Sequence, residues 1–188
     1  MTKNNQTTTH VGDGALLECS GIERRFGGIV AVTGVDFVIR PGEIFGLVGP
    51  NGSGKTTLTN AITGFYPPNK GTVRLAGKDI SGIPPHKVAK LGIARTFQNL
   101  ALFNGMSVLD NILLGRHIHM KPGVFRTALY WWTAQREEIE NREIVEEVIE
   151  FLQLEGIRHE LVDGLPIGLK KRVELARALV AEPRMLIL

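Results

Sequence analysis

The most informative stretch of the sequence, residues 49–56, reads Gly49-Pro50-Asn51-Gly52-Ser53-Gly54-Lys55-Thr56. It matches the phosphate-binding pattern G-x-x-x-x-G-K-[ST] at every fixed position. The apolar residues 44–48 come directly before it, as a strand buried on both faces would, and a helix is predicted over 55–63. Because the pattern binds triphosphates in this order of strand, glycine-rich loop and helix, we interpret residues 49–56 as a P-loop.

Each residue type in the loop has a chemical task. Glycines let successive backbone N–H groups turn toward phosphate oxygens, and the following helix adds the positive end of its dipole. Lys55 is expected to contact the β- and γ-phosphates, and the Thr56 hydroxyl to bind Mg²⁺. Residues 49–56 and the adjoining Thr57 are therefore the predicted nucleotide-binding residues, with a nucleoside triphosphate and Mg²⁺ as the expected ligands.

Composition limits the classes of protein that fit. The 188 residues carry a net charge of +3 and are 43% hydrophobic and 22% charged, which suits one domain, or a core domain with a small attached lobe. No Lys/Arg tract occurs, so no nucleic-acid partner is expected. The single cysteine, Cys19, excludes an internal disulfide and is expected to be a small buried apolar residue beside Leu16 and Leu17.

The sequence shows neither a secretory signal nor a membrane span. Residues 1–14 are polar, without the apolar stretch of a signal peptide, and we expect a disordered tail there. No apolar run approaches the roughly 18 residues needed to span a bilayer. A link to a membrane would therefore go through a partner protein. The expected compartment is the cytoplasm, and residues 15–188 are the expected nucleotide-binding domain.

Apolar and alternating runs predict an α/β fold. Its first elements are antiparallel strands, followed by a turn at Pro41-Gly42. Gly64 ends the helix that follows the P-loop. The strands are expected at 16–19, 30–32, 35–39, 71–76 and 93–97, with a further helix at 86–91.

At about residue 104 the strand patterns give way to helical ones, and a helical lobe is expected from there to residue 161. Ser107 and Asp110 form a capping-box pattern before a predicted helix at 108–114. A long amphipathic helix is predicted at 133–154, with its apolar residues on one stripe. Beyond the lobe, the sequence predicts a helix at 169–180 and a buried strand at 185–188.

Three further motifs accompany the P-loop: Arg25-Phe26-Gly27-Gly28, Arg95-Thr96-Phe97-Gln98, and Lys170-Lys171-Arg172-Val173-Glu174-Leu175-Ala176-Arg177-Ala178-Leu179. Together they resemble the nucleotide-binding domain of ABC transporters, over essentially the whole chain from about Leu16. The resemblance implies a P-loop ATPase core with a mixed sheet, an N-terminal antiparallel β part and an inserted helical lobe. Two rivals explain fewer motifs. A P-loop kinase of a small metabolite gives Gln98 no role, and non-transport ABC proteins usually carry coiled coils or paired ATPase domains.

The resemblance assigns roles to two residues outside the loop. Phe26 would stack on adenine, while Gln98 would help to coordinate Mg²⁺ and the attacking water at the hinge between the core and the helical lobe. Aromatic residues also serve as ordinary core residues at strand ends, which is the alternative for Phe26. For Gln98 the alternative is a solvated residue at the end of a strand.

Residues 165–169, Leu165-Pro166-Ile167-Gly168-Leu169, stand where the family has its signature L-S-G-G-Q. Pro166 replaces the serine, and proline supplies neither a hydroxyl nor an N–H. Gly168 keeps its N–H at the positive end of the following helix. The resemblance implies that Leu165 and Gly168 contact ATP held by a second ATP-binding subunit. The pair, a homodimer or a heterodimer, would enclose two ATP molecules.

Within the family, the sequence looks most like the ATPases of branched-chain (hydrophobic) amino-acid importers. Urea-type importers and lipopolysaccharide-export ATPases are near relatives that these residues do not separate. The implied partners are transmembrane permease subunits and, indirectly, a periplasmic substrate-binding protein. This chain would then sit at the cytoplasmic face of the inner or plasma membrane. The apolar residues Leu102, Phe103 and Met106 are expected to form the docking surface for the permease. The alternative is that they pack against the helical lobe itself.

The chain stops within the last predicted strand. In the family, a strand like 185–188 leads into an Asp that supports Mg²⁺ and a Glu that acts as the hydrolytic base, and neither follows here. A truncated gene or a fragment of a longer chain would each explain this. We expect ATP hydrolysis by the 188 residues to be close to background, and the strand 44–48 to lose part of its cover.

Overall fold

The computed structural model describes residues 14–96, 102–118 and 131–188, without the side chains of residues 131–140. Apart from Gly14, the predicted disordered tail lies outside the described residues, and so does Gln98. The chain forms two compact units, residues 1–88 (unit 1) and 89–188 (unit 2). No helix in the described ranges is both long and apolar enough to cross a membrane.

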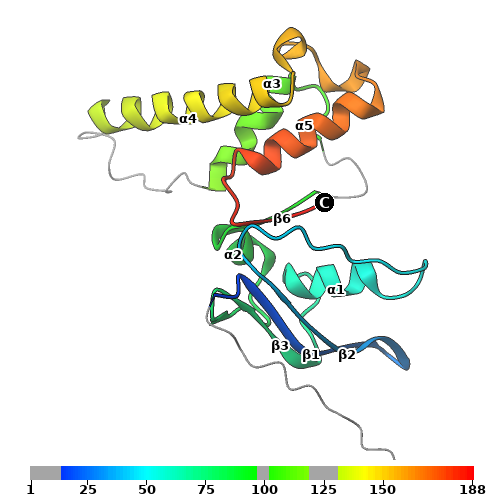
Figure 1. Ribbon diagram of the computed structural model, residues 1–188. Helices are drawn as coiled ribbons and strands as arrows, with labels where there is room; N and C mark the ends of the chain where they lie inside the picture. Colours follow the sequence, from blue (N-terminus) through cyan, green and yellow to red (C-terminus); the bar gives the residue numbers. More distant parts are fainter. Residues whose placement is uncertain (1–13, 97–101, 119–130) are drawn as a thin grey trace, which may run out of the picture. The chain divides into compact units, whose positions relative to one another are not determined.

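Unit 1 is built on an antiparallel sheet of four strands (Figure 1). Leu17, in the second strand of the sheet, pairs with Ile39 on one side and with Leu75 on the other. The predicted antiparallel strands are confirmed, but 30–32 and 35–39 form one strand. Gly34 has a positive φ of 59° and accommodates a register shift there instead of a turn. In spatial order the strands are β2 (Ile29–Ile39), β1 (Leu17–Phe26), β3 (Lys70–Leu75) and β4 (Lys78–Asp79).

The helix after the P-loop, α1 (Lys55–Ile62), contacts β1 and β2. It buries Leu58, Ala61 and Ile62, which share one face of the helix because they are three and four residues apart. The predicted stop is confirmed, since Gly64 follows the helix with a φ of 79°. A side chain on Gly64 would collide with the carbonyl oxygen of Ile83.

Cys19 lies in the buried part of β1 and is only 1% exposed. Burial raises the pKa of its thiol to about 12, with smaller contributions from the carboxylates of Glu18 and Asp36. The cysteine is free. The prediction of a small buried apolar residue is confirmed.

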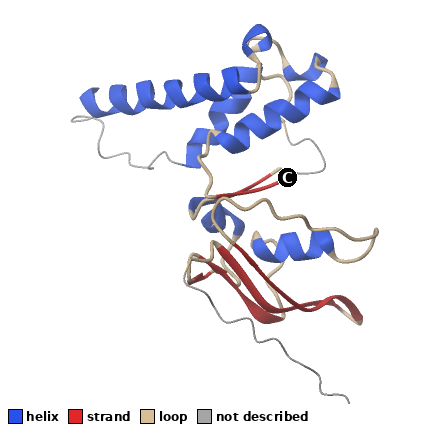
Figure 2. Ribbon diagram, viewed as in Figure 1, coloured by secondary structure: helices blue, strands red, loops and turns tan. Residues whose placement is uncertain are grey.

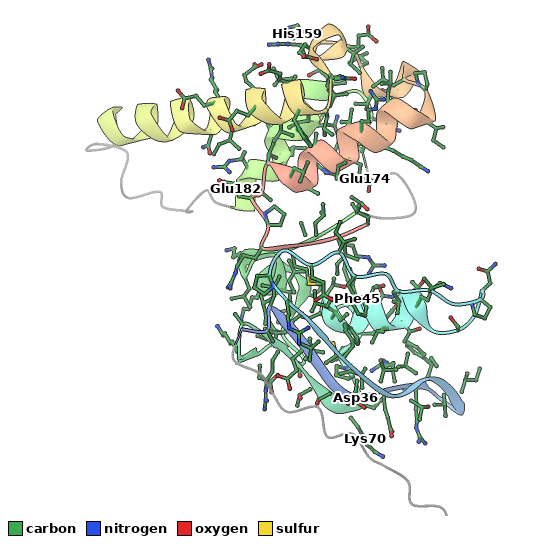
Figure 3. The ribbon with its side chains drawn as sticks, in the orientation of Figure 1. Asp36, Phe45, Lys70, His159, Glu174 and Glu182 are labelled. Atoms are coloured by element: carbon green, nitrogen blue, oxygen red, sulfur yellow. The ribbon has the colours of Figure 1, made fainter. Side chains whose placement is uncertain are left out.

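Residues 44–48 do not form the predicted buried strand, and Figure 2 draws the segment between β2 and α1 as a loop. Ile44 is 101% exposed and Val48 94% exposed. A strand exists only through hydrogen bonds to a neighbouring strand, and this segment pairs with none in the described part of the chain. Phe45, labelled in Figure 3, still makes a local contact. Its ring stacks on that of Phe37 in β2, with 5.1 Å between the ring centroids.

Unit 2 contains a small parallel sheet. β5 (Ile93–Arg95) pairs with β6 (Met185–Ile187), with Ile93 opposite Met185 and Arg95 opposite Ile187. Both predicted strands are present. The three residues of β6 are half-buried, so the expected full burial was wrong. A sheet of only two strands presents small faces, and few side chains cover them.

The helices of unit 2 follow the predicted pattern. Ser107 caps α3, because its Oγ accepts a hydrogen bond of 3.1 Å from the backbone N–H of Asp110. The predicted helices 108–114, 133–154 and 169–180 correspond to α3, α4 and α5. In the described residues the helical elements are α3 (Val108–Leu113), η1 (Leu114–Ile118), α4 (Trp131–Phe151), η3 (Glu155–Ile157), η4 (Val162–Gly164) and α5 (Ile167–Leu179), and α2 (Pro85–Lys90) spans the boundary in sequence between the units.

One hydrophobic core joins these helices. Val145 and Ile149 of α4 are buried against Ile112 of α3 and Val173 of α5, which confirms the amphipathic stripe of the long helix. The core of unit 2 thus includes side chains from α5, which lies beyond the range 104–161 expected for the helical lobe.

A buried arginine ties the helices of unit 2 to the residues before β6. Arg116 is 8% exposed, and its Nη1 donates to the Val180 carbonyl and to the Glu182 carboxylate, each over 2.7 Å. Its Nε donates to the side-chain oxygen of Asn141 on α4, over 2.8 Å. Glu182 is labelled beyond the end of α5 in Figure 3. Because a buried guanidinium requires such partners, Arg116 fixes the junction between α5 and β6.

Candidate nucleotide-binding site

Glycines shape the loop that follows residues 44–48. Gly52 and Gly54 have φ values of 80° and 90°, in the left-handed region that side chains disfavour. A Cβ on Gly54 would collide with the carbonyl oxygen of Ala31 in β2, and a Cβ on Gly49 would come within 2.7 Å of Ser53 Oγ. The loop therefore lies directly against β2, and position 54 admits no side chain.

The lysine of the motif folds back over its own loop. Lys55 Nζ donates hydrogen bonds to the carbonyl oxygens of Gly49, over 2.5 Å, and of Pro50, over 2.7 Å. The ammonium group is thereby held within the curl of the loop. An anion bound there would gain charge-assisted hydrogen bonds from it.

The start of α1 adds partial positive charge beside Lys55. The N-cap residue, Gly54, has no side chain to bond the first N–H groups of the helix, and no acidic residue occupies the first turn. Uncapped N–H groups at a helix N-terminus favour an anionic ligand. Thr56, in this turn, is exposed and Thr57 is half-buried, so the Thr56 hydroxyl is accessible.

A pocket of about 280 Å³ opens beside the loop, within unit 1. Ser53 and Lys55 line its polar part, and Val32, Val35 and Leu58 line its apolar part. Ligand sites commonly have volumes of roughly 300–1,000 Å³. The pocket thus suits the polyphosphate part of a nucleotide better than a whole nucleotide.

Phe26, the predicted adenine contact, is at the end of β1 and is 39% exposed. Its ring packs at 88° against the ring of Tyr66, and the guanidinium of Arg24 lies over it. The ring therefore keeps an accessible surface. Neither Arg24 nor Tyr66 was predicted from the sequence as a site residue. For Arg24 a signal was available, because alternation along a strand places residues 24 and 26 on the same face.

The signature residues lie at the start of α5, in unit 2. The side chain of Leu165 is only 7% exposed and belongs to the hydrophobic core, so the predicted contact of Leu165 with ATP would involve its backbone. Pro166 is the N-cap, and its carbonyl accepts hydrogen bonds from the N–H groups of Leu169 and Lys170, both over 3.0 Å. Gly168 is exposed, and a Cβ there would meet nothing within 4 Å. Its backbone is therefore accessible to a ligand.

The residues present fit a magnesium–nucleotide complex. No three His, Cys, Asp or Glu side chains of the described residues come together as a metal site. Mg²⁺ usually takes one or two protein oxygens and completes its shell with phosphate oxygens and water. The exposed Thr56 hydroxyl beside the P-loop is a donor of this kind, while the second predicted ligand, Gln98, lies outside the described residues.

Comparison with known proteins agrees with this geometry. The family model for "ABC transporter" matches residues 32–188. The chain is 38% identical over 177 residues to the high-affinity branched-chain amino acid transport ATP-binding protein BraF of Pseudomonas aeruginosa, and 37% identical over 173 residues to LivG of Escherichia coli, a protein of the same description. Each alignment covers 92% of this chain and 68% of the relative.

Solved structures give the same result for the fold. MJ1267, an ATP-binding cassette of an ABC transporter, superposes with a TM-score of 0.74 at 31% identity, covering 92% of this chain and 67% of that chain. A nucleotide-free ATP-binding cassette from an ABC transporter gives a TM-score of 0.73 at 35% identity, with the same coverage. The P-loop, the α/β fold and these matches together show that the chain belongs to the ABC transporter family, as an ATP-binding protein of the ATP-hydrolysing cassette type.

Proposed function

We propose that this chain is the ATP-binding subunit of an importer of branched-chain amino acids, and that Mg-ATP bound at its P-loop drives transport. The observation that carries the proposal is the Lys55 ammonium, held within the loop at the uncapped start of α1. The names of BraF and LivG support the substrate class, because both are described as branched-chain amino acid transport proteins.

In this proposal each predicted site residue has a separate task. Lys55 and the N–H groups of the loop hold the phosphates, Thr56 and Gln98 hold Mg²⁺, and Phe26 carries the adenine. Mg²⁺, when bound, supplies neutralisation of the phosphate charge. The N–H of Gly168 contacts the ATP held by a second ATP-binding subunit.

Substitution of the P-loop lysine tests the binding site. Lys55→Ala removes the ammonium and leaves the glycine geometry intact, so the affinity for Mg-ATP should fall about ten-fold or more. Isothermal titration calorimetry measures it. Lys87→Ala, at an exposed position of α2, removes the same charge outside the loop and should bind ATP like the parent chain. Equal affinity of Lys55→Ala and the parent would refute the assignment.

The proposed partners are permease subunits, a second ATP-binding subunit and, through the permease, a periplasmic substrate-binding protein. The chain would then be held at the cytoplasmic face of the membrane by the permease. Phe103 is 54% exposed and is the best candidate for this contact. Leu102 packs against the core of unit 2 and Met106 is half-buried, so they contribute less than the sequence suggested.

Photo-crosslinking tests the permease contact. A benzophenone side chain placed at position 103 should crosslink to a co-expressed permease subunit of a branched-chain amino-acid importer. The same group at position 151 is the control, because Phe151 is 75% exposed but lies at the end of α4. Crosslinks from position 151 alone would contradict the proposed surface.

A further inference from the structure

Three side chains in unit 1 form a surface group that the P-loop itself does not include. The guanidinium carbon of Arg24 lies 4.7 Å from the ring centroid of Phe26 and 5.7 Å from that of Tyr66. The two rings pack edge to face, with their centroids 5.4 Å apart. Arg24, Phe26 and Tyr66, here called the aromatic–arginine group, are therefore in mutual contact.

The fold brings the group together from two segments. Alternation along β1 places Arg24 and Phe26 on the same face of the strand. Tyr66 follows α1, where its N–H donates to the carbonyl of Asn60 over 3.2 Å. The next residue, Pro67, accepts a hydrogen bond of 2.6 Å from Arg24 Nη1. Arg24 thus connects the end of β1 to the segment after α1.

The arginine lies against both rings as well as bonding to Pro67. Its Nε is buried and has no hydrogen-bond partner among the described residues, so the ring faces compensate for the water that it has lost. Phe26 and Tyr66 remain 39% and 45% exposed. The group therefore lies at the surface, and its main effect is to fix the orientation of an exposed ring rather than to bury one.

We propose that Arg24 and Tyr66 are positioning residues that hold the Phe26 ring in place as the platform for the nucleobase, an inference that rests on the proposed ATP-binding function. A free phenylalanine ring would lose rotational freedom when a base stacks on it, and this loss weakens binding. Arg24 over one face and Tyr66 against the ring remove that freedom in advance. The base then stacks on the part of the ring that stays exposed.

Two ligands separate base binding from phosphate binding. Mg-ATP uses both the platform and the P-loop, whereas magnesium tripolyphosphate has no base. In titrations of the 188-residue chain, Arg24→Ala should bind Mg-ATP about three- to five-fold more weakly and bind tripolyphosphate like the parent. Arg24→Lys should recover most of the loss, because it restores a cation near the rings. Arg25→Ala is the matched control, since this exposed arginine is on the opposite face of β1.

A double-mutant cycle tests the dependence on Phe26. If Arg24 acts through the ring, Arg24→Ala should have no further effect on ATP affinity in a Phe26→Ala background. The same loss with and without Phe26, or an equal loss for both ligands, would overturn the positioning role. Failure of the parent to bind either ligand, or normal binding by Lys55→Ala, would instead overturn the proposed function and this inference with it.

Discussion

Residues 44–48 and β6 (Met185–Ile187) are both short apolar segments, one before the P-loop in unit 1 and the other at the end of unit 2. β6 is joined to its surroundings by hydrogen bonds of 3.0 Å from Met185 N–H to the Gly92 carbonyl and from Thr96 N–H to the Ile187 carbonyl. Residues 44–48 pair with no strand in the described part of the chain. Apolar composition favours a strand, but only a partner with free backbone groups makes one.

The two units also differ in how far they bury apolar side chains. In unit 2, side chains from three helices surround one core, and Ile149 is fully buried. In unit 1, Ile44 is fully exposed, and Phe45 keeps a stacking contact to Phe37. A side chain of the same type therefore contributes very differently to stability in the two places, and this difference can be measured.

The largest effect is expected from the isoleucine pair. Ile149→Ala leaves a cavity in the core of unit 2 and should lower the free energy of unfolding by about 2–5 kcal/mol. Ile44→Ala removes the same atoms from an exposed position and should cost less than about 0.5 kcal/mol. Urea denaturation followed by circular dichroism at 222 nm measures both. Similar losses for the two variants would mean that residues 44–48 are covered in solution.

The next largest loss of stability is expected at Arg116, which fixes the junction between α5 and β6. Arg116→Ala leaves the Val180 carbonyl and Glu182 without their donor and should cost about 1–3 kcal/mol in the same unfolding measurement. Arg158→Ala is the control, because its ion pair with Glu146 is more exposed and should contribute less than about 1 kcal/mol. If Arg116→Ala loses no more stability than Arg158→Ala, the junction does not depend on the buried guanidinium.

Hydrogen exchange compares the two segments directly. The N–H groups of Met185 and Thr96 should exchange at least about ten times more slowly than unprotected amides, because opening their hydrogen bonds costs free energy. The amides of residues 44–48 should exchange near the unprotected rate. Exchange followed by mass spectrometry on peptides from each segment is the measurement. Strong protection of residues 44–48 would contradict the exposed, unpaired segment.

The smallest effect concerns the buried part of unit 1. Because burial raises the pKa of the Cys19 thiol from 9.0 to about 12, the unfolded chain loses this proton first as the pH rises. The thiol therefore has almost no effect on stability below about pH 8, and the free energy of unfolding falls as the pH rises further, by about 0.8 kcal/mol between pH 8 and 9.5. In Cys19→Ala, the free energy of unfolding measured by urea denaturation should not show this part of the decrease at alkaline pH. The same alkaline decrease in both proteins would indicate that the thiol is not buried.

Local features could be predicted from the sequence because their causes lie within a few residues. The P-loop needs glycine at positions 52 and 54 for its left-handed backbone, and Ser107 caps α3 through an N–H only three residues away. The amphipathic stripe of α4 follows from a period of 3.6 residues. The glycine pattern, the capping residue and the stripe are all visible in the printed chain.

Long-range pairings were decided only by the tertiary structure. Residues 44–48 have the composition of a buried strand, but composition cannot supply a neighbour with free backbone groups. Arg24 reaches Pro67, 43 residues away, and Arg116 reaches Glu182, 66 residues away. Such contacts depend on where the chain returns after a helix or a turn. The sequence therefore determined the phosphate-binding loop and the helices, whereas the exposure of residues 44–48 and the support of Phe26 depend on which distant segments meet.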